Sequence, residues 1–161
     1  MPNRSSLSYL APIIFLVLSM AIACVAPTGP TQKYEPIADT ISVVDSWART
    51  SPQSGGNGAA FAVILNGLDR PVRLVGATTE AAASVELHET SNENDVMRMV
   101  HHPEGFEIGS GEILILEPGG KHMMLIGLTA PLTAGESTTI QLLFEGIDPM
   151  TIDVPVREPQ K

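Results

Sequence analysis

Two histidines and two methionines stand in the second half of the chain at spacings that β-strands can bring together. They are His88, Met99, His122 and Met124, in the segments VELHET, DVMRM and KHMML. Imidazole nitrogen is a borderline ligand and thioether sulfur is a soft, uncharged one, so the combination suits Cu(I) and binds Ca²⁺ or Mg²⁺ poorly. The sequence therefore predicts that any metal chemistry of this chain involves copper at these four residues.

Strand periodicity indicates which neighbouring side chains could join such a site. His122 and Met124 are two residues apart and share a face, whereas Met123 points to the opposite face. Met97 and Met99 also share a face, so Met97 remains a rival to Met99 as a ligand. Taken one at a time, these residues have simpler explanations, namely a solvated histidine or a methionine that fills the core.

His101 and His102 follow the second of these methionines directly and could add a ligand for Cu(II). Adjacent residues of a strand point to opposite faces, so only one of the two could join a given site. We expect the pair to lie in a surface loop instead.

Short apolar runs that could form strands recur from residue 41 onward. Asn-Gly, Pro-Gly and Ala-Gly turn signals separate them, which is typical of an all-β sandwich or barrel. The runs cover residues 41–47, 59–65, 72–77, 83–89, 96–100, 112–116, 122–128, 138–145 and 150–156. We expect a single β-sandwich domain of about eight or nine strands over residues 40–157, followed by a short tail over 158–161.

The beginning of the chain predicts export. An apolar run over residues 10–23 follows a positively charged start; it is shorter than the roughly 20 residues of a membrane span and matches the apolar region of a signal peptide. A small residue directly precedes Cys24, which resembles the bacterial lipoprotein signal. We predict a lipoprotein-type signal peptide over 1–23, lipidation of Cys24 and a flexible tether over 24–39. Ordinary cleavage that removes Cys24 or leaves it as a free thiol is the alternative.

The charge and the cysteine content exclude several classes of function. Cys24 is the only cysteine, so the predicted domain has no disulfide framework, no thiolate metal site and no cysteine nucleophile. A blue-copper electron-transfer centre requires a thiolate and is therefore excluded. The net charge of −9 argues against nucleic acid as a partner. We find no Ser-His-Asp ordering, phosphate loop or acid pair, and predict that the protein is not an enzyme.

The four His and Met residues and the segments around them together resemble the PCuAC family of periplasmic copper chaperones. The resemblance covers roughly residues 41–156 and rests on SWART, AAFAVILNG, VELHET, MRM, LEPGGKHMMLIGL and LLFEG. The interval from Met99 to His122 is one residue longer than in the family pattern. We attribute the difference to an insertion in a loop over 101–112, because loops tolerate insertions.

This resemblance implies a cupredoxin-like β-sandwich that binds one Cu(I) through His88, Met99, His122 and Met124. It also implies delivery of the ion to a copper-acceptor protein, such as a cytochrome c oxidase subunit or assembly factor. We expect an extracytoplasmic chaperone that is lipid-anchored to the membrane, in the periplasm or on the outer face of the cell membrane. The alternative is a lipid-anchored β-sandwich module that binds a partner protein and has no metal function.

Overall fold

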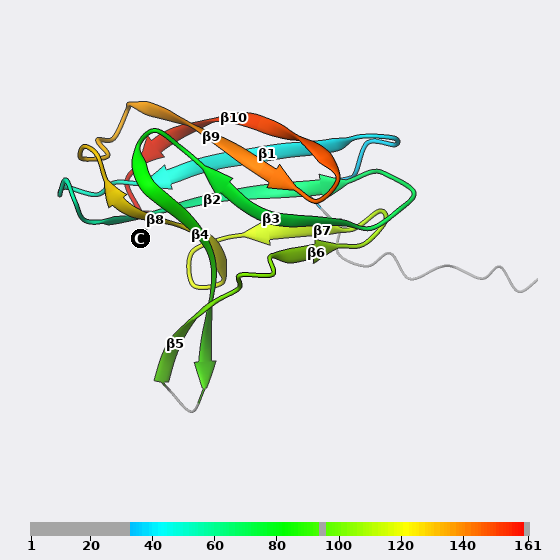
Figure 1. The fold of residues 1–161 in the computed structure, drawn as a ribbon, viewed down its shortest axis with the longest axis horizontal. Helices are drawn as coiled ribbons and strands as arrows, with labels where there is room; N and C mark the ends of the chain where they lie inside the picture. The colour runs from blue at the N-terminus through cyan, green and yellow to red at the C-terminus, as the bar shows by residue number, and fades with distance from the viewer. Residues whose placement is uncertain (1–32, 94–95, 160–161) are drawn as a thin grey trace, which may run out of the picture. The chain divides into compact units, whose positions relative to one another are not determined.

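All regular structure in the described part of the chain is β. The computed structural model describes residues 33–93 and 96–159 (Figure 1), and no helix in them is long and apolar enough to cross a membrane. The ten strands are β1 (Ile41–Arg49), β2 (Asn57–Asn66), β3 (Val72–Thr78), β4 (Ala82–Glu93), β5 (Val96–His101), β6 (Phe106–Ile108), β7 (Ile113–Leu116), β8 (Lys121–Leu128), β9 (Ser137–Phe144) and β10 (Ile147–Arg157). The predicted all-β class is confirmed, whereas the predicted signal peptide over 1–23 and Cys24 lie outside the described residues.

Strand β6 has no counterpart among the predicted runs. It lies within the segment 101–112, which we expected to be a loop, and it pairs with β3. Phe106 and Ile108 are buried and Glu107 between them is exposed. Three residues are too few to give a periodic signal in the sequence, so the loop expectation is wrong for this part of the segment.

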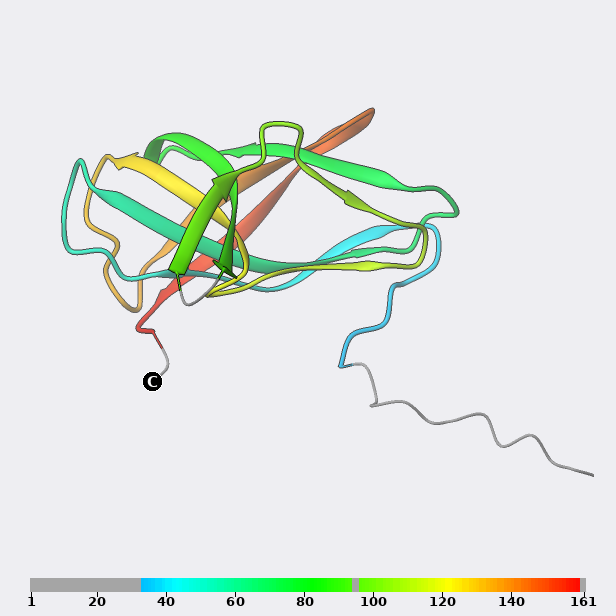
Figure 2. The ribbon, with the colours of Figure 1, turned by 90° about the horizontal axis from the view of Figure 1, so that it is seen from below.

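The sheet closes on itself. Its strands follow the order β5-β4-β8-β2-β1-β10-β9-β3-β6, and β3 also pairs with β4, at Ala77 and Val85. Strand β7 is not part of this order and pairs with β2. Figures 1 and 2 show the resulting flattened ring of strands, which wraps around one interior.

Alternation of apolar side chains fills that interior. In β9 Ile140, Leu142 and Phe144 are buried while Gln141 between two of them is exposed, as expected of a strand with one face toward the core. Strand β2 differs, because every residue after Asn57 is buried. A strand covered on both faces reads as a continuous apolar run, which explains the segment AAFAVIL.

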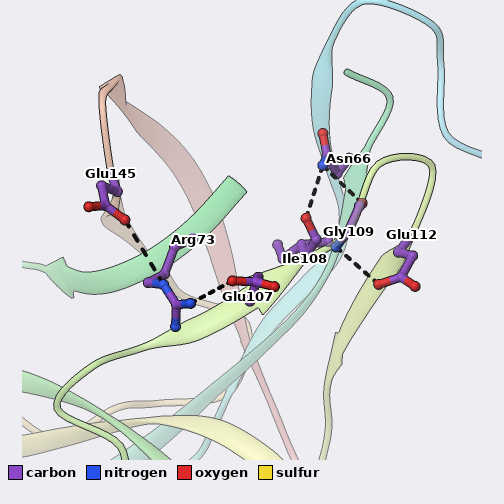
Figure 3. Close-up of polar contacts among 7 residues, drawn as sticks. All are labelled: Asn66, Arg73, Glu107, Ile108, Gly109, Glu112 and Glu145. Atoms are coloured by element: carbon purple, nitrogen blue, oxygen red, sulfur yellow. Dashed lines mark hydrogen bonds and ion pairs between the residues drawn. The ribbon is translucent and has the colours of Figure 1, made fainter. Parts of the chain in front are cut away.

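The end of β2 carries a buried polar side chain. The Asn66 side chain is fully buried, and its Nδ2 donates to the carbonyls of Arg70, Ile108 and Gly109 at 2.9, 3.0 and 2.9 Å. Its Oδ1 accepts from the backbone N–H of Leu68 at 3.1 Å. Figure 3 shows the bonds to Ile108 and Gly109, which tie the end of β2 to the end of β6 and the residue after it. Asn66 therefore makes the hydrogen bonds that a buried amide requires.

An exposed ion-pair group lies near Asn66 in Figure 3. Arg73 Nη2 is 2.6 Å from Glu107 Oε2, and Arg73 Nε is 4.0 Å from Glu145 Oε2. Both carboxylates are well exposed, so these pairs contribute little to stability compared with the buried amide.

The segment that leads into β1 is fastened to the turn after β2. The N–H of Asp39 donates to the Gly67 carbonyl and the N–H of Gly67 donates to the Thr40 carbonyl, both at 2.8 Å. A Cβ atom at Gly67 would lie 1.7 Å from the carbonyl oxygen of Ile37. Only glycine permits this close approach of two backbones.

The β4–β5 hairpin extends away from the ring (Figure 1). Strand β8 pairs with β4 from Ala82 to Glu89, and β5 pairs with it from His88 to Glu93. All six residues of β5 are exposed. His88 therefore lies at the base of the hairpin, where β4 has a neighbouring strand on each side.

Candidate metal centre

His88 is the centre of a cross-strand row of three histidines. In the strand register it lies directly opposite His122 of β8 and directly opposite His101 of β5. The ring centroids of His88 and His122 are 5.9 Å apart, and those of His88 and His101 are 5.1 Å apart with the planes at 25°. Directly opposite residues of antiparallel strands point to the same side of the sheet, so the three imidazoles share one face.

The two predicted methionine ligands occupy the diagonal positions around His88. Met124 lies opposite Glu86 and Met99 lies opposite Thr90, each one pleat away from the histidine row and on the same face. Diagonal neighbours in a sheet are about 7–8 Å apart, within reach of long side chains. The register thus brings the two methionines to the row, one from each flanking strand.

The register also separates Met99 from its rivals. Met97 lies opposite Asn92, two pleats from the histidine row, and is exposed. Met123 is fully buried in the core on the opposite face, as the strand periodicity predicts. Met99 is itself 53% exposed, so of the two β5 methionines it is the nearer to His88 and still accessible from outside.

The His88 side chain holds one nitrogen without a partner. Its Nε2 lies 2.9 Å from Glu86 Oε2; because the carboxylate accepts, Nε2 carries the proton of the neutral ring. Nδ1 then presents a lone pair, which is buried and has no hydrogen-bond partner among the described residues. Buried polar atoms in native proteins nearly always have partners, so this nitrogen is suited to a ligand from outside the chain.

Glu86 is affected by the same contacts. The hydrogen bond from His88 lowers the pKa of the Glu86 carboxyl below its usual value, and the nearby His101 lowers it further. The carboxylate is therefore ionised at neutral pH and places a negative charge beside the histidine row.

The His122 ring is held in one orientation by the turn before β8. Its Nδ1 donates to the carbonyl of Gly120 at 3.0 Å, which leaves the lone pair on Nε2. A hydrogen bond of this kind fixes the tautomer of many metal-binding histidines. The ring centroid of Phe61 is 6.5 Å from that of His122 and 4.6 Å from that of Trp47, and both ring pairs are tilted. His122 is only 5% exposed, so it is an oriented donor in apolar surroundings.

The expectation that His101 lies in a surface loop is wrong. His101 is the last residue of β5, and one ligand atom from each of Glu86, His88 and His101 can be chosen so that all three lie within 4.8 Å of one another. Sequence reasoning missed a signal here. Residues 88 and 101 are equally distant from Asn94-Asp95, and Asn and Asp are favoured in hairpin turns.

His102 belongs to a different environment. Its Nε2 lies 3.3 Å from Glu89 Oε2 and its Nδ1 lies 3.3 Å from Glu104 Oε1, and its ring is 5.0 Å from that of Phe106. As periodicity requires, only one of the two adjacent histidines joins the His88 row.

The residues brought together fit a soft cation well. A set of two imidazoles and two thioethers is neutral and polarisable, and it includes an oriented nitrogen on His122 and an unpartnered one on His88. Cys24, the predicted lipidation site, lies outside the described residues.

A protein family and several relatives match this chain. The sequence model of the family described as "Putative lipoprotein LpqE-like" matches residues 41–156. The protein named "Putative lipoprotein Lxx21020", from Leifsonia xyli subsp. xyli, is 38% identical over 121 residues, which is 75% of this chain and 72% of that protein.

Solved structures of PCuAC domains share the fold. The copper-bound PCuAC domain from PmoF2 matches with a TM-score of 0.63 and 22% identity, over 78% of this chain and 99% of that domain. The solution structure of CuI-DR1885 from Deinococcus radiodurans matches with a TM-score of 0.52 and 28% identity, over 75% of this chain and 82% of that chain. The PCuAC-type β-sandwich expected from the sequence is therefore confirmed.

Proposed function

The chain belongs to the family described as "Putative lipoprotein LpqE-like", and on that premise we propose that it is an extracytoplasmic copper chaperone. It binds one Cu(I) through His88, Met99, His122 and Met124 and transfers the ion to an acceptor protein. One observation supports the proposal most: in the strand register these four residues fall on one face of three neighbouring strands, and His88 among them has an Nδ1 without a hydrogen-bond partner in the described part of the chain.

The donor set favours Cu(I) over other ions. Thioethers are soft ligands that bind Mg²⁺, Ca²⁺ and Zn²⁺ poorly, and a neutral set places no excess negative charge on a monovalent cation. Structurally similar domains include one described as copper-bound and one described as CuI-bound. Both descriptions support the choice of copper for this chain.

The position of Met99 supports transfer as well as binding. Met99 belongs to the exposed β5 strand, whereas His122 is buried in the ring of strands. An approaching acceptor can replace the Met99 thioether first, while the buried imidazole still holds the ion. We infer that the acceptor docks on the hairpin side, and that it is a cytochrome c oxidase subunit or assembly factor.

The proposed function also includes a location outside the cytoplasm and a role as a carrier, not as an enzyme. We infer that residues 1–23 direct export and that Cys24 receives the lipid anchor. The tether over 24–39 then links this anchor to the domain over 40–157. The family description as a lipoprotein supports this location. We expect the protein to carry copper without catalysing a reaction.

A Cu(I) titration tests the proposal. The full-length chain, purified in detergent without a metal-binding tag, is titrated under reducing, oxygen-free conditions against a chromogenic Cu(I) chelator. We expect uptake of one equivalent. His122→Ala and Met99→Ala each remove a ligand and should weaken the Cu(I) affinity by at least about 10–100-fold. Changes in residues that only support metal ligands already have an effect of this size.

Met97→Ala is the matched control, because Met97 has the same side chain, strand and face as Met99 but lies one pleat farther from His88. It should bind Cu(I) like the wild type. Equal weakening by Met97→Ala and Met99→Ala would contradict the assignment of the ligand.

The second candidate function is a β-sandwich module that binds a partner protein without metal. The exposed apolar side chains of β5, which are Val96, Met97, Met99 and Val100, favour it because such patches mark interaction surfaces. Failure of the wild-type chain to take up Cu(I) would favour this function over the chaperone.

A further inference from the structure

Two donors beside His88 have no role in the proposed Cu(I) site. Glu86 lies two residues before His88 on β4 and on the same face, and His101 lies directly opposite His88 on β5. We propose that Glu86, His88 and His101 form a second coordination mode that takes Cu(II). The proposal rests on the proposed function in one respect, since both modes use His88.

The chemistry of the three donors differs from that of the Cu(I) set. A carboxylate and two imidazoles contain no sulfur and carry one negative charge, which suits a divalent borderline ion. Among divalent first-row metals, sites with nitrogen and oxygen donors bind Cu²⁺ most tightly. The second set keeps His88 and has the Glu86 carboxylate and the His101 imidazole in place of two thioethers and the His122 imidazole. This change of donors shifts the preferred oxidation state from Cu(I) to Cu(II).

The distances fit the square-planar geometry that Cu(II) prefers. With metal–ligand bonds of about 2.0 Å, adjacent donors lie about 2.8 Å apart and opposite donors about 4.0 Å apart. Glu86 Oε2 is 2.9 Å from His88 Nε2 and 4.0 Å from His101 Nδ1. The carboxylate thus stands in an adjacent relation to one imidazole and an opposite relation to the other.

Side-chain freedom allows the remaining adjustment. The three donor atoms lie within 4.8 Å of one another, slightly more than a square plane permits. The side chain of His101 is 45% exposed and that of Glu86 is 37% exposed, so both can move toward an ion without repacking the core. His88, at 14% exposure, is the fixed point of the site.

Each of the two modes takes one ligand from strand β5. Met99 and His101 are two residues apart on β5 and share a face. The Cu(I) mode uses Nδ1 of His88 and the Cu(II) mode uses Nε2. A neutral imidazole has only one nitrogen free of its proton, so Cu(II) on Nε2 leaves the proton on Nδ1, and one oxidation state of copper should displace the other. The site would then accept either form of the ion, with β5 supplying sulfur to Cu(I) and nitrogen to Cu(II).

The test measures the two oxidation states separately on the full-length chain, purified in detergent without a metal-binding tag. Cu(II) is titrated without reductant and followed by its visible absorption and by electron paramagnetic resonance. We expect coupling to two imidazole nitrogens in the wild type and to one in His101→Ala. His101→Ala should weaken Cu(II) binding about tenfold or more and leave the Cu(I) affinity unchanged, whereas Met99→Ala should do the reverse.

His102→Ala is the matched control, because the adjacent histidine faces Glu89 and Glu104 instead. It should bind Cu(II) like the wild type, and thermal melts of all variants verify that they fold. An unchanged Cu(II) affinity and nitrogen coupling in His101→Ala would overturn the proposal. So would an equal loss in His102→Ala, or tighter binding of Zn(II) than of Cu(II). Failure of the wild type to bind Cu(I) would refute the proposed function alone, since the Cu(II) measurements decide the second mode.

Discussion

Asn66 and His88 are both polar side chains on strands of the ring, yet their surroundings differ. The two N–H groups of the Asn66 amide are shared among three backbone carbonyls, and its Oδ1 accepts from one backbone N–H. The imidazole of His88 uses Nε2 with Glu86 and keeps Nδ1 buried without a partner among the described residues. The first group is satisfied by the fold, and the second can be satisfied only by something the fold does not contain.

We interpret Asn66 as a structural polar group and His88 as a proposed ligand. Leaving a buried donor or acceptor unpaired costs about 1–3 kcal/mol, a large share of the stability of a small domain. A protein that retains such an atom gives up stability at that position. The comparison leads to four predictions about the two regions.

Asn66→Ala should have the largest effect on stability. It removes two N–H donors and the Oδ1 that accepts from Leu68 near the end of β2. At about 1 kcal/mol for each of these three groups, the free energy of unfolding should fall by about 3 kcal/mol. Urea denaturation measures the change, and the Cu(I) affinity of the folded variant should stay at the wild-type value. A loss below about 1 kcal/mol would mean that water replaces the amide.

Cu(I) bound near His88 should raise the free energy of unfolding by about as much as Asn66→Ala lowers it. At a free Cu(I) concentration 100 times the Kd, binding to the folded state alone adds about 2.7 kcal/mol to the free energy of unfolding. Thermal melts with and without Cu(I), under reducing conditions, measure the increase. Asn66→Ala should show the same increase, because its defect is remote from the ligands, whereas His122→Ala should show much less.

His88→Leu should change the stability of the copper-free protein by no more than about 1 kcal/mol, and in the stabilising direction, because it replaces an unpaired buried nitrogen with an apolar group. The same variant should lose Cu(I) binding. Urea denaturation and the chelator titration measure the two effects. If the copper-free variant is destabilised by several kcal/mol, the imidazole has a structural role and the contrast with Asn66 fails.

Glu145→Gln should have the smallest effect. Its carboxylate is 74% exposed and 4.0 Å from Arg73 Nε, and an exposed pair of this kind contributes at most about 0.5 kcal/mol. Urea denaturation at low and high salt measures it. A larger, salt-sensitive loss would show that charges near Asn66 matter as much as its buried hydrogen bonds.

The sequence predicts most of the strands and the faces of several candidate ligands. Alternation puts Met123 in the core and keeps Met124 beside His122, and the structure agrees. Alternation does not give the register of the β4–β5 hairpin, because that register depends on the position of the turn. Alternation alone therefore does not reveal that His101 lies directly opposite His88.

Contacts between distant segments are harder to predict. Asn66-Gly67 reads as an ordinary turn, but Asn66 bonds to carbonyls about forty residues away, with sequence separations of 42 and 43. Gly67 is required by the approach of Ile37, which no local pattern reveals. Likewise the unpartnered Nδ1 of His88 becomes evident only when all of its neighbours are placed.

The pairing of β1 with β10 has a consequence for folding. These strands lie side by side in parallel, and Ser46 Oγ donates to the carbonyl of Asp153, 107 residues away in the chain. Joining such distant segments costs loop entropy and makes folding slow. The ring of strands cannot close before β10 has been synthesised, so the chain stays open until then. A late-closing topology suits a chain that crosses a membrane before it folds, as we propose for this protein.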